Sequence, residues 1–272
     1  MKIKELLNDY KDVPMHLKEM VISHLLSIKK SELLLDDNII KPNVIEEYHN
    51  IIKEIKTGKP IQYILETAYF YNNEFYVNNS VLIPRVETEY LIKETYDLIN
   101  KYFKDKAVKI LDIGTGSGNI AITLKELLPR AIVTATDIST KALEVAKINT
   151  KKLNQDITLK ESNLFDNINE TFDVIISNPP YIKETSKTVE ENVNKYEPHL
   201  ALYAKNNGLY YLEEILKEAP KYLNKPSIIA FETGEEQKEE LKDITYKYFS
   251  KAKIITKQDL NNYERYFFVI NE

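Results

Sequence analysis

The sequence predicts an α/β protein, in which a seven-stranded, doubly wound (Rossmann-like) sheet follows a small all-helical domain. From about residue 87 onward, short apolar stretches alternate with helical patterns, which is typical of a parallel sheet covered by helices on both faces. The first 66 residues instead carry apolar side chains such as Leu17, Val21 and Leu25 at three- and four-residue intervals, the spacing of amphipathic helices. A chain of 272 residues is long enough for two domains.

The amino-terminal part reads as a helical bundle that is interrupted at a few polar positions. Breaks between helices are expected at Ser31, at residues 36–38 and at residues 57–60. From residue 69 to residue 83, aromatic and polar residues alternate around asparagine-rich turns, which predicts a β-hairpin. The expected domains are therefore a helical bundle over 1–66, a hairpin connector over 67–86 and an α/β domain over 87–272.

Seven apolar segments of the α/β part have the length and composition of strands. They are residues 109–113, 132–136, 158–161, 174–177, 227–232, 252–257 and 265–270. The last two segments are separated by only a short polar stretch, which favours an antiparallel hairpin at the end of the sheet.

A glycine-rich loop follows the first of these strands. Three of the six glycines of the chain, Gly114, Gly116 and Gly118, alternate with Thr115 and Ser117, and a helical pattern follows. Glycine lets the backbone approach a ligand closely, and a helix N-terminus favours anionic groups, so the loop indicates a nucleotide-like cofactor. A dinucleotide fingerprint would need glycine at the sixth position of the loop. That position is not glycine here.

An acidic residue, Asp137, ends the second strand, about 20 residues beyond the loop, at the spacing where a carboxylate binds ribose hydroxyls in such folds. An alternative interpretation is purely structural. In that interpretation the glycines make a tight turn, and Asp137 caps the helix that begins near Ser139.

The fourth strand ends in the tetrapeptide Asn178-Pro179-Pro180-Tyr181. Proline has no N–H, so the carbonyl groups around it are rigidly held and remain free to accept hydrogen bonds. Asn178 adds a side-chain carbonyl and Tyr181 an aromatic face. Together they predict a cage for a planar group that carries NH2. A proline-terminated strand with Tyr181 in the core is the structural alternative.

These motifs resemble those of S-adenosylmethionine-dependent methyltransferases that modify exocyclic or amide nitrogens. The closer resemblance is to the HemK/PrmC family, the protein-(glutamine-N5) methyltransferases of peptide chain release factors. It covers almost the whole chain, in the order of the family. The similar segments are residues 58–64, Phe70, Phe75, residues 82–89, the glycine loop, residues 178–182, residues 196–198 and residues 201–202. The chain departs from the family pattern at Val86, where proline is usual, and at residues 205–208.

The resemblance implies S-adenosyl-L-methionine as cofactor. It implies that residues 114–118 hold the methionine part, Asp137 the ribose, and Asn163 with Leu164 the adenine, and that Asn178 contacts cofactor as well as substrate. We expect the Asn178 side-chain oxygen and the Pro179 carbonyl each to accept one N–H of the substrate glutamine amide.

The resemblance also implies roles for the residues around the substrate amide. Pro180 and Tyr181 would complete the catalytic pocket, with Tyr181 either packed against the amide plane or closing the pocket. Glu197 would line the substrate pocket, with a salt bridge or a turn as the alternative role. Arg85 and Glu87 would shape the loop before the α/β domain, with capping by Glu87 or Thr88 as the alternative.

Composition restricts the function further. The chain has no cysteine, which excludes disulfides, a thiol nucleophile and cysteine-based metal sites, and we expect no metal. No apolar run approaches the length of a membrane span, so we expect a cytoplasmic protein, and we expect a monomer. The net charge of −5 disfavours a basic face for direct nucleic-acid binding.

Three classes of function follow from these observations. The first is methylation of the glutamine in the Gly-Gly-Gln motif of class 1 release factors, with the helical domain binding the substrate protein. The second is methylation of an exocyclic amine of adenine or guanine in RNA or DNA, for which the same cage would serve. The third is a cofactor-binding protein without catalysis, which would have no need of Asn178.

Overall fold

The computed structural model describes residues 1–33, 39–104 and 106–272, so the break expected at residues 36–38 lies outside the described residues. The chain divides into two compact units, Met1–Thr67 and Ala68–Glu272. Most of the stretch expected to form a separate connector falls in the second unit. Within the described residues, no helix combines the length and the apolar character needed to cross a membrane.

The first unit is helical. Its elements are α1 (Ile3–Asn8), α2 (Met15–Leu26), the short 3-10 turn η1 (Lys30–Glu32), α3 (Pro42–Ile55) and α4 (Ile61–Ile64). Apolar side chains from successive helices form one core, to which Leu6, Val21 and Ile52 contribute fully buried side chains. Ser31 lies in η1, and residues 57–60 separate α3 from α4, as the break signals predict.

A buried lysine of α2 donates hydrogen bonds to the carboxyl end of α1. Lys18 is only 3% exposed, and its ammonium donates to the carbonyl oxygens of Leu7 at 2.6 Å and Asp9 at 3.0 Å. These carbonyls lie at the end of α1, where the helix leaves its last acceptors without partners. Lys18 therefore supplies the donor that α1 lacks.

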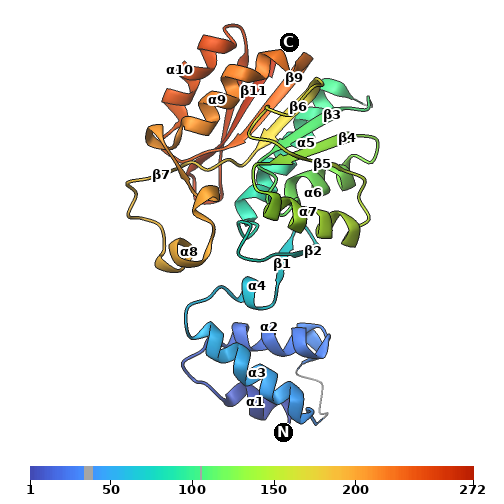
Figure 1. Ribbon diagram of the computed structural model, residues 1–272, viewed down its shortest axis with the longest axis vertical. Coiled ribbons are helices and arrows are strands. Elements are labelled where there is room, and N and C mark those ends of the chain that lie inside the picture. The colour runs from blue at the N-terminus through green and yellow to red at the C-terminus, as the bar shows by residue number, and fades with distance from the viewer. Residues whose placement is uncertain (34–38, 105) are drawn as a thin grey trace. The chain divides into compact units, whose positions relative to one another are not determined.

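The second unit contains a seven-stranded sheet (Figure 1). Its strands are β3 (Lys109–Ile113), β4 (Ile132–Asp137), β5 (Thr158–Glu161), β6 (Phe172–Ser177), β9 (Leu223–Glu232), β10 (Lys253–Gln258) and β11 (Glu264–Asn271), in the order β10-β11-β9-β6-β3-β4-β5. β11 runs antiparallel to both of its neighbours. The seven predicted strands and the reversed last strand are confirmed. β9 begins four residues earlier than predicted. The prediction started after Pro226 because a proline interrupts the sequence pattern of a strand.

Helices cover both faces of the sheet (Figure 1). One face packs against α9 (Tyr210–Glu218) and α10 (Lys238–Tyr248), and the other carries α5 (Val86–Phe103), α6 (Asn119–Leu127) and α7 (Thr140–Lys152). Alternation along the strands divides the side chains between these layers. Ile175 and Phe231, for example, belong to the α9–α10 core, whereas their buried neighbours Ile176 and Ala230 point to the opposite face. The doubly wound architecture is confirmed.

Two small sheets flank the carboxyl edge of the main sheet. β1 (Thr67–Phe70) and β2 (Asn73–Tyr76) form a two-stranded sheet, and β7 (Ile182–Lys183) pairs in parallel with β8 (Tyr203–Ala204). The connection between β7 and β8 contains α8 (Glu191–Tyr196) and η2 (His199–Ala201), and the turns η3 (Asn206–Gly208) and η4 (Ala219–Lys221) flank α9. Strands of two residues are too short to show a periodicity, so the sequence did not predict β7 and β8.

Asn149 of α7 joins the first of these small sheets to the glycine loop. Its side chain accepts from the Tyr76 N–H at 2.7 Å and donates to the carbonyl oxygens of Tyr76 at 2.9 Å and Ser117 at 2.8 Å. Because Asn149 is fully buried, these bonds do not compete with water.

The buried lysine of the first unit provides a test of its packing. We expect Lys18→Met to reduce the free energy of unfolding of this unit by about 1.5 to 3 kcal/mol, because two buried carbonyls lose a charged donor. Lys4→Met is the control, since Lys4 is an exposed residue of α1. Urea unfolding combined with hydrogen exchange of peptides from residues 1–67 measures the effect. Equal stability of the two variants would contradict it.

Candidate active site

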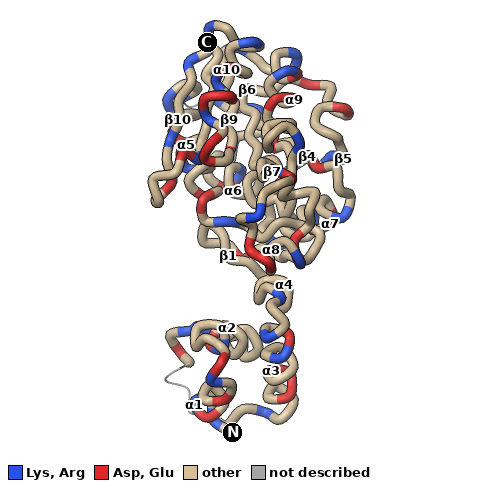
Figure 2. Tube along the Cα trace, turned by 90° about the vertical axis from the view of Figure 1, so that its left-hand side faces the viewer, with Lys and Arg blue, Asp and Glu red and all other residues tan. Residues whose placement is uncertain are grey.

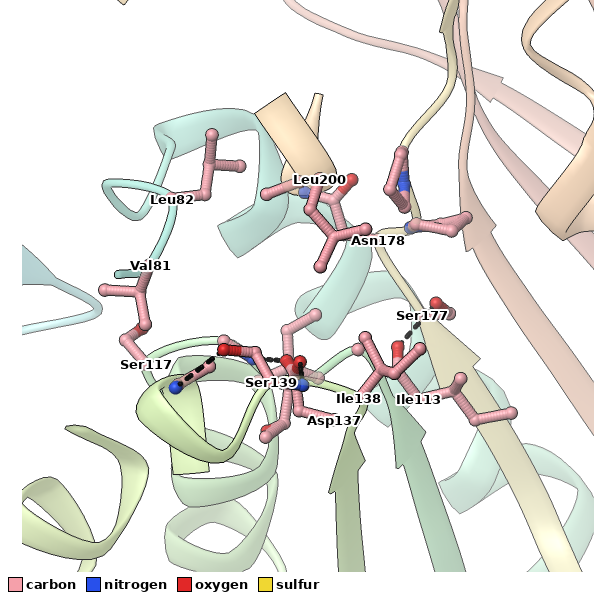
Figure 3. A pocket seen from close by; sticks show the side chains of 18 of the residues that line it. Val81, Leu82, Ile113, Ser117, Asp137, Ile138, Ser139, Ser177, Asn178 and Leu200 are labelled. Carbon is pink, nitrogen blue, oxygen red and sulfur yellow. Dashed lines mark hydrogen bonds between the residues drawn. The ribbon is translucent and has the colours of Figure 1, made fainter. Parts of the chain in front are cut away.

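A cavity opens at the carboxyl ends of β3, β4 and β6, where open α/β sheets bind ligands (Figure 3). The residues predicted for cofactor and substrate come together there. Those that line it are Gly114, Thr115, Gly116, Ser117, Asp137, Asn163, Leu164, Asn178, Pro179 and Pro180, together with Arg85, Thr88, Pro198 and Leu200. Gly118, Tyr181 and Glu197 lie outside this lining.

The glycine loop has the left-handed backbone that glycine permits. Gly114, Gly116 and Gly118 have φ values of +73°, +56° and +83°. A Cβ atom on Gly114 or Gly116 would meet nothing within 4 Å, whereas one on Gly118 would lie 3.2 Å from Ile122 and 3.4 Å from Ala146. Gly118 thus allows α6 to pack against α7, and the other two glycines leave open space beside the cavity.

The amide groups of this loop are used inside the protein. Gly114 and Thr115 donate to the Thr136 carbonyl at 2.9 and 2.8 Å, and Gly116 donates to the Asp137 carboxylate at 2.9 Å. These three N–H groups are therefore bonded inside the protein, and Gly114 and Gly116 leave their bare Cα atoms beside the cavity.

Asp137 connects the loop to the start of α7 (Figure 3). Besides Gly116, its carboxylate accepts from the Ser139 N–H at 2.9 Å, while the Ser139 hydroxyl itself caps the helix by accepting from Ala142. Burial raises the pKa of Asp137, and the N–H groups that it accepts from oppose this rise. Capping is thus the role of Ser139, and Asp137 presents a carboxylate to the cavity.

A second carboxylate, Asp112, lies fully buried beneath the loop. It accepts from the Thr115 hydroxyl at 2.6 Å. Burial raises the pKa of Asp112 to about 7, the Thr115 hydroxyl opposes this rise, and the nearby charge of Asp137 adds to it. Sequence reasoning missed Asp112. The available signal was a single charge within the otherwise apolar end of a buried strand.

Asn163 and Leu164 line the cavity from the segment after β5. Leu164 has a φ of +52°, a conformation that a residue with a branched side chain rarely adopts. The Ser162 hydroxyl donates to the Leu164 carbonyl at 2.9 Å, and the Leu164 side chain packs against the core of the α9–α10 face. Leu164 is therefore held by a hydrogen bond at its carbonyl and by packing of its side chain.

Two residues of the tetrapeptide after β6 that carry hydrogen-bond acceptors, Asn178 and Pro179, line the cavity. The Asn178 Nδ2 group donates to the Thr88 hydroxyl at 3.1 Å, which leaves the Asn178 Oδ1 atom on the other side of the amide. Within the described part of the chain, no group donates a hydrogen bond to Asn178 Oδ1 or to the Pro179 carbonyl. Thr88 does not cap α5, because its hydroxyl donates to Glu232 at 2.7 Å.

Tyr181 turns away from the cavity. Its hydroxyl donates to the other Glu232 oxygen at 3.0 Å, and its carbonyl accepts from Gln237 Nε2 at 3.0 Å. Burial raises the pKa of both Tyr181 and Glu232. These contacts anchor the tetrapeptide to β9 and to the start of α10. Sequence reasoning missed Glu232 and Gln237, because Glu232 ends an apolar strand as a single charge and Gln237 lies within a run of polar residues typical of a solvated helix.

The buried carboxylate of Glu197 forms an ion pair with the partly exposed Arg85 and accepts from the Ile83 N–H at 3.2 Å. Arg85 lines the cavity, and Glu197 lies behind it. The carbonyl of Glu87 accepts from the Tyr266 hydroxyl at 2.9 Å. The segment that precedes α5 is thereby fixed to the segment after α8 and to β11.

Comparisons with known proteins agree with this geometry. A family model described as the PrmC N-terminal domain matches residues 3–65, and one described as the methyltransferase small domain matches residues 93–201. A release factor glutamine methyltransferase of Flavobacterium psychrophilum is 38% identical over 240 residues, which are 86% of this chain and 84% of the relative. The chain belongs to the release factor glutamine methyltransferase family. The family resemblance of the motifs is confirmed.

Other members of the family and a solved structure extend this result. The Bacillus cereus member is 35% identical over 258 residues, covering 92% of this chain and 90% of the relative. The crystal structure of a methyltransferase from Pyrococcus furiosus has a TM-score of 0.54 and 20% identity, covering 82% of this chain and 98% of that one. The Pyrococcus furiosus methyltransferase therefore shares the fold of this chain.

The buried carboxyl of Asp112 predicts a pH dependence of stability. Its pKa is raised in the folded protein, so the folded state retains the proton between about pH 4 and pH 7 while the unfolded chain loses it. Stability therefore falls as pH rises through this window. The free energy of unfolding of the Asp112→Asn variant should fall less steeply with pH. Between pH 4 and pH 8, the difference from the wild-type protein should shift in favour of the variant by up to about 4 kcal/mol. Urea unfolding at several pH values measures this, and parallel curves would contradict it.

Gly208 allows the segment around η3 to approach the tetrapeptide. Its φ is +86°, and a Cβ atom there would collide with the Tyr181 carbonyl and with Gln237 Nε2. We expect Gly208→Ala to speed hydrogen exchange in residues 178–183 and 203–210. Gly58→Ala is the control, since Gly58 has a φ of +85° in the first unit. It should cost only the backbone strain of about 1 to 2 kcal/mol and leave exchange in these two segments unchanged. Equal exchange in the two variants would show that the collision is relieved without cost.

Proposed function

We propose that this protein transfers a methyl group from S-adenosyl-L-methionine to the N5 nitrogen of the glutamine in the Gly-Gly-Gln motif of class 1 release factors. The observation that carries the proposal is the pair of available acceptors, Asn178 Oδ1 and the Pro179 carbonyl, at one cavity. A primary amide has two N–H donors, which this pair matches in number and kind. The names of the family members supply the substrate class.

The residues of the cavity fit the proposed cofactor. The open space beside Gly114 and Gly116 would accept its methionine part, and Asp137 would accept hydrogen bonds from its ribose hydroxyls. Asn163 and Leu164 would lie against the adenine, with Leu164 making an apolar contact. When bound, S-adenosyl-L-methionine supplies an electrophilic methyl group on a sulfonium.

The protein's own contribution is orientation. The lone pair of an amide nitrogen is delocalised into its carbonyl, which makes the nitrogen a weak nucleophile. Asn178 Oδ1 and the Pro179 carbonyl would each accept one N–H and so fix the direction in which the nitrogen presents its lone pair. Such fixed dipoles need no reorganisation during the reaction. The excess proton would leave the amide nitrogen for water after methyl transfer, so the cavity needs no general base.

Tyr181 and Glu197 take supporting roles in this mechanism. Tyr181 would hold the tetrapeptide in place through Glu232, rather than pack on the substrate amide as the sequence suggested. Glu197 would keep Arg85 at the cavity wall through their ion pair. Pro180, which lines the cavity, would add a rigid apolar wall beside the amide.

A nucleobase amine is the second candidate substrate, because it also offers two N–H donors. The distribution of charged residues disfavours a nucleic-acid substrate. Of the described residues that line the cavity, Arg85 is the only basic one, and it is paired with Glu197. Acidic and basic residues are interspersed along the chain (Figure 2), and the net charge is −5. Phosphate binding normally requires a concentration of basic residues. A protein without catalysis would not need the two acceptors.

The helical unit is the proposed binding site for the release factor, since residues 3–65 match a domain that characterises the family. We further propose that the enzyme acts as a monomer in the cytoplasm.

Transfer of labelled methyl tests this function. Purified class 1 release factor should become labelled, whereas the same factor with its Gly-Gly-Gln glutamine replaced, total RNA and DNA should not. Asn178→Ala should lower the rate by about 100-fold or more, as removal of a preorganised dipole does, while the affinity for S-adenosyl-L-methionine stays within a few fold. Label on nucleic acid instead of the factor would favour the second candidate. Loss of cofactor affinity together with activity would contradict the role of Asn178.

A further inference from the structure

A chain of buried hydrogen bonds continues from Asn178 into the protein. Asn178 Nδ2 donates to Thr88 Oγ1 at 3.1 Å, Thr88 Oγ1 donates to Glu232 Oε2 at 2.7 Å, and the Tyr181 hydroxyl donates to Glu232 Oε1 at 3.0 Å. Thr88 and Glu232 are each only 2% exposed. Neither of them has a part in the cofactor and substrate contacts proposed above.

The fold brings these residues together from three elements. Ser177 of β6 lies opposite Phe231 of β9 in the parallel register, so the next residues, Asn178 and Glu232, emerge side by side at the carboxyl edge of the sheet. The first turn of α5, which packs against β9, places Thr88 between them.

With Glu232 ionised, the direction of each hydrogen bond in this chain follows from the donors and acceptors present. An ionised carboxylate only accepts, and a hydroxyl has a single hydrogen. Once the Thr88 hydrogen points at Glu232, only lone pairs of Thr88 face Asn178, and these can accept from an NH2 group but not from a carbonyl oxygen. A flipped Asn178 would lose the bond and place two acceptors against each other.

Groups around Glu232 act on its ionised form in opposite directions. Burial raises its pKa, but the hydroxyls of Thr88 and Tyr181 and the positive charge of Arg265 all oppose the rise. Glu87 is the other charged group that acts on it, and it adds to the rise.

We propose that Thr88 and Glu232 are positioning residues, which hold the Asn178 amide with Oδ1 towards the cavity and Nδ2 towards the protein. The inference rests on the proposed function, because it requires Asn178 to accept a hydrogen bond from the substrate. In the opposite orientation Asn178 would present N–H donors to a substrate NH2 group, and no hydrogen bond would form. The fraction of enzyme in the correct orientation then sets kcat.

Substitutions of Thr88 test the proposal. Thr88→Val keeps the shape of the side chain and removes the hydroxyl, so Asn178 loses the group that selects its orientation. We expect kcat for release factor methylation to fall about 10-fold or more, while KM for the factor and Kd for S-adenosyl-L-methionine change by less than about threefold. Thr88→Ser retains the hydroxyl and should recover most of the wild-type kcat.

Thr95→Val is the matched control. Thr95 is a fully buried threonine of the same helix, and its hydroxyl donates to the Leu91 carbonyl at 2.7 Å, away from the cavity. This variant should lose a comparable amount of thermal stability with kcat unchanged. Tm and cofactor binding, measured for every variant, separate loss of orientation from loss of folding.

The outcomes are distinct. If the wild-type enzyme labels the release factor and Thr88→Val keeps its kcat, the inference is wrong and the proposed function stands. It is also wrong if Thr88→Ser loses as much as Thr88→Val, or if Thr95→Val loses the same kcat. If the wild-type enzyme does not label the factor, the proposed function is wrong and the inference falls with it.

Discussion

The buried carboxylate of Glu232 is the constraint on which the substrate side of this site depends. A charged group removed from water must be satisfied by hydrogen bonds or by opposite charge, because its desolvation is otherwise costly. Glu232 receives the hydroxyls of Thr88 and Tyr181, and Arg265 lies nearby. Each of these partners belongs to a different segment. The requirement to satisfy one carboxylate therefore fixes α5, the tetrapeptide and β11 with respect to β9.

The part of the cavity that we propose for the cofactor depends on a similar arrangement of buried acids. Asp112 holds the glycine loop through Thr115, and Asp137 holds it through the amide of Gly116. These bonds hold the loop from below, with open space beside Gly114 and Gly116. Burial of two carboxylates so close together raises the pKa of both, so this arrangement is obtained at some cost in stability near neutral pH.

Local sequence signals predicted the fold well and the site in part. The strands and the glycine loop carry strong patterns of apolar periodicity and backbone permissiveness, so their positions follow from residues near each other in the chain. The network around Asn178 does not, since the register of β6 and β9 brings the tetrapeptide beside Glu232, and the packing of α5 against β9 adds Thr88. The orientation of Tyr181 depends on this register. From the sequence alone, an aromatic residue after two prolines reads as part of the pocket.

The two acceptors proposed for the substrate are held by independent means, and this bears on specificity. Asn178 Oδ1 is oriented by a side-chain network, whereas the Pro179 carbonyl belongs to a backbone with two consecutive prolines, which is fastened by Gln237 at the next turn. A group that satisfies both acceptors must donate two hydrogen bonds. Glutamine does so, but glutamate has almost the same shape and only acceptors, so its carboxylate would face two unsatisfied oxygens. Unpaired acceptors discriminate strongly between such isosteres. In the proposed mechanism, the contacts that orient glutamine would therefore also exclude glutamate.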